Sequence, residues 1–115
     1  AVFEAKLPAD HPRHALALLP LGQLLCQRGN TDEGEHLLSQ GRELRLAHYG
    51  ADDQRTAEAD LALGTCLVAA DRATEAKPHL VNANRVFQAS QDVRQAEAAA
   101  ALRALGDQDF QPDNK

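Results

Sequence analysis

The stretch ALALLPLGQLLCQRG, residues 15–29, has a counterpart 42 residues later in AEADLALGTCLVAAD, residues 57–71. Its central pair Leu21-Gly22 returns as Leu63-Gly64, and after another 42 residues as Leu105-Gly106. Self-similarity at one fixed offset is typical of repeat architectures, in which each unit buries its apolar face against the next. The stretch therefore predicts a chain of repeated units.

Further positions upstream and downstream keep the same offset. These are Ala15, Ala57 and Ala99; Ala17, Ala59 and Ala101; Leu25 and Leu67; Glu33 and Glu75; Gly34 and Ala76; Leu38 and Leu80; Gly41 and Ala83; and Val2-Phe3 with Val86-Phe87. A leucine-rich composition alone does not explain matches at so many positions in one register. The offset is therefore the length of the repeat.

Each unit has the 3.6-residue periodicity of two helices. Pro12 suits the first turn of a helix, Asn30 with Glu33 resembles a capping box, and an Asp before Gln54 is a good N-cap. The predicted inward positions on the first two helices are Ala15, Leu18, Leu21, Gly22 and Leu25, then Leu37, Leu38, Gly41, Leu44 and Leu46. The predicted helices are 12–28, 31–48, 53–70, 73–90 and 92–105.

The composition of the chain agrees with an all-α fold. Its 115 residues allow one domain, and they include 22 alanines and 17 leucines but no isoleucine, methionine or tryptophan. The net charge of −5 argues against a nucleic-acid binder. No apolar run is long enough to span a membrane, and AVFEAKLPAD at the N-terminus lacks the pattern of a signal peptide. We therefore expect a cytoplasmic protein without membrane or nucleic-acid partners.

The small residues that recur in the units resemble those of the tetratricopeptide repeat family. That family has a Leu-Gly pair in the first helix and small residues in the second, here Leu21-Gly22, Gly34 and Gly41, then Leu63-Gly64, Ala76 and Ala83. The unit is longer than the usual 34 residues, and its loops ADHPRHA and ADDQRTA look like those of the kinesin-light-chain subtype. The resemblance implies a right-handed α-α superhelix, a solenoid of stacked antiparallel helical hairpins.

In this interpretation the chain is a window on a longer array. It contains a half repeat at 1–9, repeats at 10–51 and 52–92, a terminal helix at 92–106 and a disordered tail at 107–115.

Two positions depart from the pattern. Pro20 lies inside a predicted helix, where we expect a local kink or a water-bound carbonyl near Leu16, and Asp60 replaces the apolar residue expected from Leu18.

Residues that could carry chemistry have simpler structural explanations. The paired acids Glu33 and Glu35, Asp52 and Asp53, and Asp107 and Asp109 lie at expected helix starts or in loops. His11 and His14 could share a face but lack further ligands, and His36, His48 and His79 are expected to be isolated on the surface. Cys26 and Cys66 are expected to be separate apolar fillers. The sequence thus predicts no enzyme, no metal and no cofactor.

The remaining candidate is the concave groove that first helices line in such arrays. The residues predicted to line it are Leu16, Leu19, Gln23, Gln27, Glu58, Leu61, Thr65 and Ala69, with Cys26 and Val68 beside them. The alternative for the leucines is that they only pack between repeats.

We expect a non-catalytic module, part of a larger bacterial regulatory or signalling protein, that binds a peptide or protein in this groove. The alternatives are an architectural spacer that self-associates through Val2, Phe3 or the 96–105 helix, and, with less support, a small-molecule-sensing domain.

Overall fold

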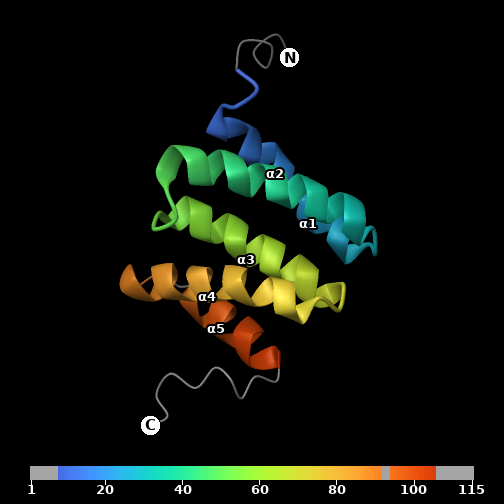
Figure 1. Cartoon of the computed structure of the whole chain (residues 1–115), viewed down its shortest axis with the longest axis vertical. Coiled ribbons are helices and arrows are strands. Elements are labelled where there is room, and N and C mark those ends of the chain that lie inside the picture. The colour runs from blue at the N-terminus through green and yellow to red at the C-terminus, as the bar shows by residue number, and fades with distance from the viewer. Residues whose placement is uncertain (1–7, 92–93, 106–115) are drawn as a thin grey trace.

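The computed structural model describes residues 8–91 and 94–105, and within these ranges every regular element is a helix (Figure 1). The half repeat predicted at 1–9 and the tail predicted at 107–115 fall wholly or mostly outside the described residues. The elements are η2 (Pro12–His14), α1 (Ala15–Gln27), α2 (Thr31–Tyr49), α3 (Gln54–Ala69), α4 (Ala73–Ala89) and α5 (Arg94–Ala104). The predicted all-α class is confirmed for this part of the chain. With η2 and α1 taken together as the first predicted helix, each predicted helix is present within two residues of its expected ends.

Short turns make each helix reverse the direction of the one before it (Figure 1). Helix α2 packs on α1 and α3, and α4 packs on α3 and α5. Helix α3 also touches α1, so it has neighbours on several sides and lies in the middle of the stack. None of the described helices is long and apolar enough to cross a membrane.

The helices cross where the sequence places small residues. A Cβ atom on Gly22 would lie 2.7 Å from Cγ of Leu38, and one on Gly64 would lie 2.7 Å from Cγ of Leu80. These two contacts are 42 residues apart on both partners, so the packing has the offset of the sequence repeat. Ala15, Ala57, Ala76 and Ala83 are fully buried. The prediction that small residues mark close crossings is confirmed at Gly22 and Gly64.

The cap of one helix was predicted correctly and that of another was not. The carboxylate of Asp53 accepts a hydrogen bond from the backbone N–H of Arg55 at 2.8 Å, as expected of an N-cap. The side chain of Asn30 makes no capping hydrogen bond, so the predicted capping box is wrong. The turn before α2 instead uses Gly29, whose φ of +91° favours glycine.

Two prolines lie within helices without ending them. Helix α1 continues through Pro20, as predicted, and α4 likewise continues through Pro78. Both prolines are at exposed positions. Water can therefore reach the side of the helix where the missing N–H leaves a carbonyl unpaired.

The buried face of α1 differs from the predicted one. Leu21, predicted to face the core, is 50% exposed, whereas Leu19 is only 5% exposed. Leu19 packs over Gly41 of α2, where a Cβ atom would lie 2.8 Å from Cδ2 of the leucine. The core face of α1 is thus Ala15, Leu19, Gly22 and Cys26.

Candidate interaction groove and buried polar network

A hollow of about 310 Å³ lies between α1, α3 and α5. Six of the eight residues predicted for the groove line it: Gln23, Gln27, Glu58, Leu61, Thr65 and Ala69. A smaller hollow of about 120 Å³ continues along α1 and is lined by the other two, Leu16 and Leu19, together with Gln23 and Glu58. The structure therefore brings all the predicted groove residues to one side of the stack.

The leucines of this side have different environments. Leu19 and Leu61 are 5% and 6% exposed and form part of the core. This agrees with the alternative prediction that the groove leucines pack between repeats. Leu16 is 62% exposed and remains open to solvent. Of the three, only Leu16 offers a broad apolar surface to a partner.

Polar side chains of the hollow fall into two groups. Glu58 accepts a hydrogen bond from Nη1 of Arg45 at 2.7 Å and lies 3.3 Å from Nη1 of Arg94. Gln23, Gln27 and Thr65 are exposed, and the structure records no hydrogen bond for these three side chains within the described part of the chain. The carboxylate of Glu58 is therefore balanced by arginines, while two amides and one hydroxyl keep their hydrogen-bonding capacity.

Helix α5 contributes two further residues to the groove that were not predicted to line it, Arg94 and Glu97. The guanidinium of Arg94 also lies 4.7 Å from the centre of the Phe87 ring, a cation–π distance. The 42-residue register makes α5 the third first helix, so the register contained the signal that α5 also faces the groove.

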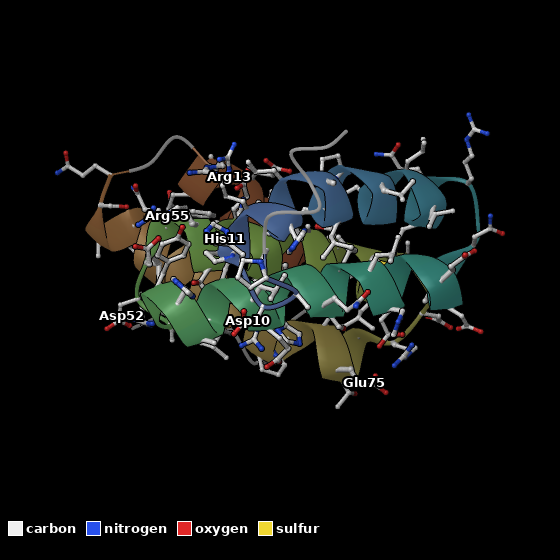
Figure 2. All side chains as sticks on the ribbon, turned by 90° about the horizontal axis from the view of Figure 1, so that it is seen from above. Asp10, His11, Arg13, Asp52, Arg55 and Glu75 are labelled. Atoms are coloured by element: carbon white, nitrogen blue, oxygen red, sulfur yellow. A yellow bond between two sulfur atoms is a disulfide. The ribbon has the colours of Figure 1, made fainter. Side chains whose placement is uncertain are left out.

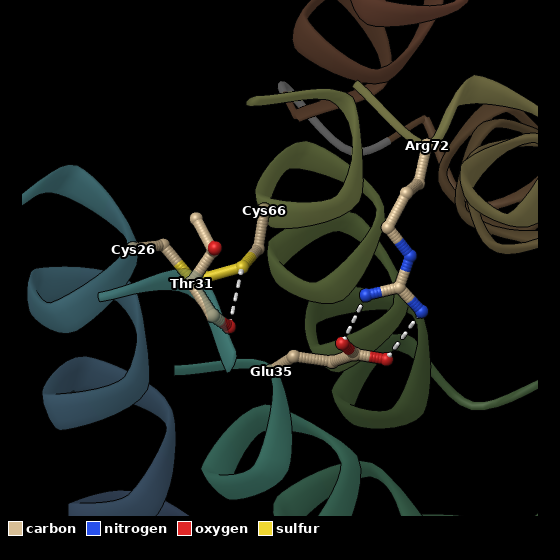
Figure 3. Close-up of a disulfide and its surroundings, with 5 residues drawn as sticks. All are labelled: Cys26, Thr31, Glu35, Cys66 and Arg72. Carbon is tan, nitrogen blue, oxygen red and sulfur yellow. Dashed lines mark hydrogen bonds and ion pairs between the residues drawn. A yellow bond between two sulfur atoms is a disulfide. The ribbon is translucent and has the colours of Figure 1, made fainter. Parts of the chain in front are cut away.

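The two cysteines are joined in a disulfide that links α1 to α3 (Figure 3). Their Cα atoms lie 5.6 Å apart, although the residues are 40 positions apart in sequence. The prediction of two separate apolar fillers is therefore wrong. Cys26 lies two positions later in its repeat than Cys66 does, and this mismatch concealed the pairing.

The disulfide forms part of the wall of the hollow and packs against the first turn of α2. Both cysteines line the hollow. A Cβ atom on Gly34 would lie only 2.5 Å from Sγ of Cys26, and Sγ of Cys66 lies 3.9 Å from the carbonyl oxygen of Thr31 (Figure 3). The absence of a side chain at Gly34 therefore leaves the space that the disulfide occupies.

A polar network surrounds Asp60 of α3, which is fully buried. Its Oδ1 accepts a hydrogen bond from Nε of Arg42 in α2 and lies 2.9 Å from Nδ1 of His79 in α4. Its Oδ2 accepts a hydrogen bond from Nδ2 of Asn82 at 2.7 Å. The expectation that His79 is isolated on the surface is wrong, because its ring contacts a buried carboxylate.

Opposing effects set the pKa of Asp60. Burial alone would raise the pKa of this carboxyl, because the charged form loses its hydration. Hydrogen bonds from His79, Arg42 and Asn82, with the positive charge of Arg42, outweigh burial and hold the pKa below its ordinary value. Asp60 is thus an ionised carboxylate that connects three helices.

The described acids of the predicted pairs lie at helix starts or in loops, as expected, and all of them except Glu33 in the first turn of α2 have a hydrogen-bond or ion-pair partner. Both carboxylate oxygens of Glu35 accept hydrogen bonds from Arg72, at 2.5 and 3.1 Å (Figure 3). Asp52 pairs with Arg85 at 2.8 Å, and Asp53 is the cap of α3. Asp107 and Asp109 lie outside the described residues.

The histidines of the first turn also have backbone partners. Nδ1 of His11 accepts a hydrogen bond from the backbone N–H of Arg13 at 3.1 Å. The side chains of His11 and Arg13 lie at the start of η2 (Figure 2). Nε2 of His14 lies 2.8 Å from the carbonyl oxygen of Pro8. In the described ranges no three His, Cys, Asp or Glu side chains are placed to hold a metal ion.

Comparison with known proteins adds no assignment: no family model, curated protein or solved structure matches this chain.

Proposed function

We propose that this chain is a tetratricopeptide-type interaction module that binds an extended peptide segment in the hollow between α1, α3 and α5, without catalysis. The observation that carries the proposal is the set of unpartnered polar side chains, Gln23, Gln27 and Thr65, on the walls of that hollow. A peptide brings an unpaired N–H and C=O at each residue, and amide and hydroxyl side chains satisfy both kinds of group.

The spacing of the two glutamines supports an extended ligand. Gln23 and Gln27 are four residues apart on α1, which corresponds to a rise of about 6 Å along the helix axis. Two residues of an extended chain span about 6.6–6.8 Å. Successive outward-facing backbone groups of an extended peptide would therefore meet successive glutamines, with the exposed Leu16 available to an apolar side chain.

The family assignment within this proposal rests on the 42-residue register and on the equivalent crossings at Gly22 and Gly64. A right-handed superhelix follows from the resemblance and stays a prediction, as does a place in a larger bacterial regulatory or signalling protein. The lack of catalysis is likewise part of the proposal. Its support is that Glu35, Asp52, Asp53, Asp60 and His79 have structural partners.

The cytoplasmic location also stays a prediction, and the disulfide weighs against it. Disulfides persist in oxidising compartments, whereas those in cytosolic proteins are usually transient and redox-sensing. An exported form of this module would hold the Cys26–Cys66 bond permanently, and a cytoplasmic form would cycle it.

A peptide library displayed on phage tests the proposal. Peptides selected on the immobilised protein are measured by fluorescence polarisation against the wild type and against Gln27→Arg and Thr65→Arg, two exposed changes that fill the hollow. Each change is expected to weaken binding at least about tenfold, which is about 1.4 kcal/mol. The control is Gln88→Arg on the exposed side of α4, which should bind as the wild type does. Folded groove variants with unchanged affinity would refute the proposal. Changes at Leu19 or Leu61 are unsuitable, because both side chains are buried.

A second candidate function, self-association, is supported by the outer face of α1. Leu21 and Leu24 are 50% and 44% exposed, whereas their counterparts 42 residues later, Leu63 and Cys66, are 4% and 2% exposed. Analytical ultracentrifugation distinguishes this candidate. A concentration-dependent dimer lost in Leu21→Glu/Leu24→Glu supports it, and a strict monomer at high micromolar concentration counts against it.

A further inference from the structure

We infer that the Cys26–Cys66 disulfide is a redox-controlled cross-link that regulates the peptide groove. In the oxidised form it holds α1 against α3 in the binding geometry, and in the reduced form the C-terminal end of α1 can move away from α3. The inference rests on the proposed function, because it concerns the regulation of the same hollow. It starts from the place of the bond, which joins the two helices that carry Gln23, Gln27 and Thr65.

Helix α1 has no other polar tie to the stack. Within the described residues, no side chain of Ala15–Gln27 makes a hydrogen bond or ion pair with another element. Apart from the disulfide, α1 is held by apolar packing and by its short turn into α2, where the backbone N–H groups of Gly29 and Asn30 donate to carbonyls of α1. Its outward leucines are half exposed. Breaking the S–S bond therefore removes the one specific attachment between α1 and α3.

The other helices are held independently of the disulfide. Helix α2 reaches α3 through Arg42 on Asp60 and Arg45 on Glu58, and reaches α4 through Glu35 on Arg72. These ion pairs involve no sulfur chemistry and persist in a reducing solution. Movement on reduction is therefore expected at the C-terminal end of α1 and not at α3 or α4.

The redox step requires a dithiol, such as dithiothreitol or a cellular dithiol protein. A thiolate of the reductant attacks Sγ of Cys26, because this residue is 9% exposed and Cys66 only 2%, and releases the thiolate of Cys66. The second thiolate of the reductant then attacks the mixed disulfide and releases Cys26. The reductant becomes a cyclic disulfide, its two protons pass to the cysteines, and two electrons reduce the bond.

Linkage makes the inference quantitative. If oxidation favours peptide binding by some factor, the peptide must stabilise the oxidised form by the same factor. Couplings between two sites in one protein are commonly about 5- to 150-fold. We expect dithiothreitol to weaken the affinity for a library-selected peptide within that range, and the peptide to raise by the same factor the dithiothreitol ratio needed for half reduction.

The experiment has two measurements on the full chain. The first is hydrogen–deuterium exchange of the oxidised protein and of the protein in dithiothreitol. Opening the covalent loop lowers the global stability and therefore the amide protection of every helix. A loss of protection that is larger in the last turns of α1 than in α4 supports the inference. Unchanged protection in α1 overturns it, and equal loss in α4 also overturns it, because the bond would then be a staple for the whole fold.

The second measurement is peptide affinity under the same two conditions, with Cys26→Ala/Cys66→Ala as the matched variant. The variant should bind with the affinity of the reduced wild type and should not respond to dithiothreitol. A selected peptide that binds both redox forms equally would refute the redox control and leave the proposed function intact. If no peptide binds the oxidised protein, the proposed function fails, and the exchange measurement alone decides whether reduction frees the C-terminal end of α1. If the variant does not fold, the half-reduction shift in the wild type still decides the coupling.

Discussion

The buried carboxylate of Asp60 gives the sharpest prediction about stability. Asp60→Asn keeps the shape of the side chain but removes the charge that faces Arg42, whose side chain is only 20% exposed. Removing one partner of a buried ion pair typically costs about 3–5 kcal/mol, because the other charge stays buried without compensation. We expect the free energy of unfolding at pH 7 to fall by about that amount.

The melting temperature follows from the length of the chain. A domain of about 100 residues loses roughly 4 °C in Tm for each kcal/mol. Asp60→Asn should therefore melt about 12–20 °C below the wild type when helix content is followed by circular dichroism. Urea unfolding, with both curves extrapolated to water, checks the free energy independently.

Two matched variants separate the ion pair from the general effect of a substitution. The double variant Asp60→Leu/Arg42→Leu replaces both charged residues by leucine, which is the residue found at Leu18, the counterpart of Asp60 in the first repeat. It should recover most of the lost stability. Asp52→Asn breaks an exposed pair with Arg85 and should cost less than about 1 kcal/mol. A loss below about 1 kcal/mol in Asp60→Asn, or a double variant no more stable than the single one, would show that the network contributes little.

Three further predictions concern pH, the disulfide and one helix crossing. The pKa of Asp60 is lower in the folded than in the unfolded protein. Its contribution to stability is therefore present above the unfolded pKa near 3.9 and is lost as the pH falls through the folded pKa. The urea midpoint of the wild type should drop in this acidic range, and that of Asp60→Asn should change less. Reduction of Cys26–Cys66 opens a covalent loop with a sequence separation of 40, so chain entropy predicts a loss of about 4 kcal/mol, measured by urea unfolding with and without dithiothreitol; equal midpoints would contradict the estimate. Gly64→Ala places a Cβ atom 2.6 Å from Cδ2 of Leu80 and should lower the free energy of unfolding by about 1–3 kcal/mol, measured by thermal unfolding. A Tm equal to that of the wild type would show that the crossing has room for a methyl group.

The sequence predicted the helices well because their ends and crossings depend on local residues. Pro12 at the first turn, Asp53 as a cap and the glycines at 22 and 64 each act within one turn or one contact. The 42-residue offset added which helices are equivalent. Neither signal needs knowledge of the neighbouring helices.

The orientation of α1 could not be predicted in the same way. Leucines occupy so many positions on this helix that more than one face is apolar, and periodicity alone does not select between Leu19 and Leu21. The choice depends on Gly41 of α2, which leaves room for Leu19. The disulfide escaped prediction for a related reason, because its cysteines are not equivalent in the repeat and meet only through the packing of α1 on α3.

Helix α3 joins these observations, because both a covalent bond and charged contacts hold it in the stack. On the groove side Cys66 ties α3 to α1 by a covalent bond, and on the opposite side Asp60 ties it to α2 and α4 through hydrogen bonds and charge. A reductant acts only on the covalent attachment, whereas acid acts on the Asp60 network and on the ion pairs of Glu58 with Arg45 and Arg94. The two conditions should therefore loosen different helices: α1 in dithiothreitol at neutral pH, and the α2 and α4 contacts of α3 in acid with the disulfide intact. Since Gln23 and Gln27 lie on α1 while Thr65 lies on α3, the groove changes shape in the first case and keeps its covalent span in the second.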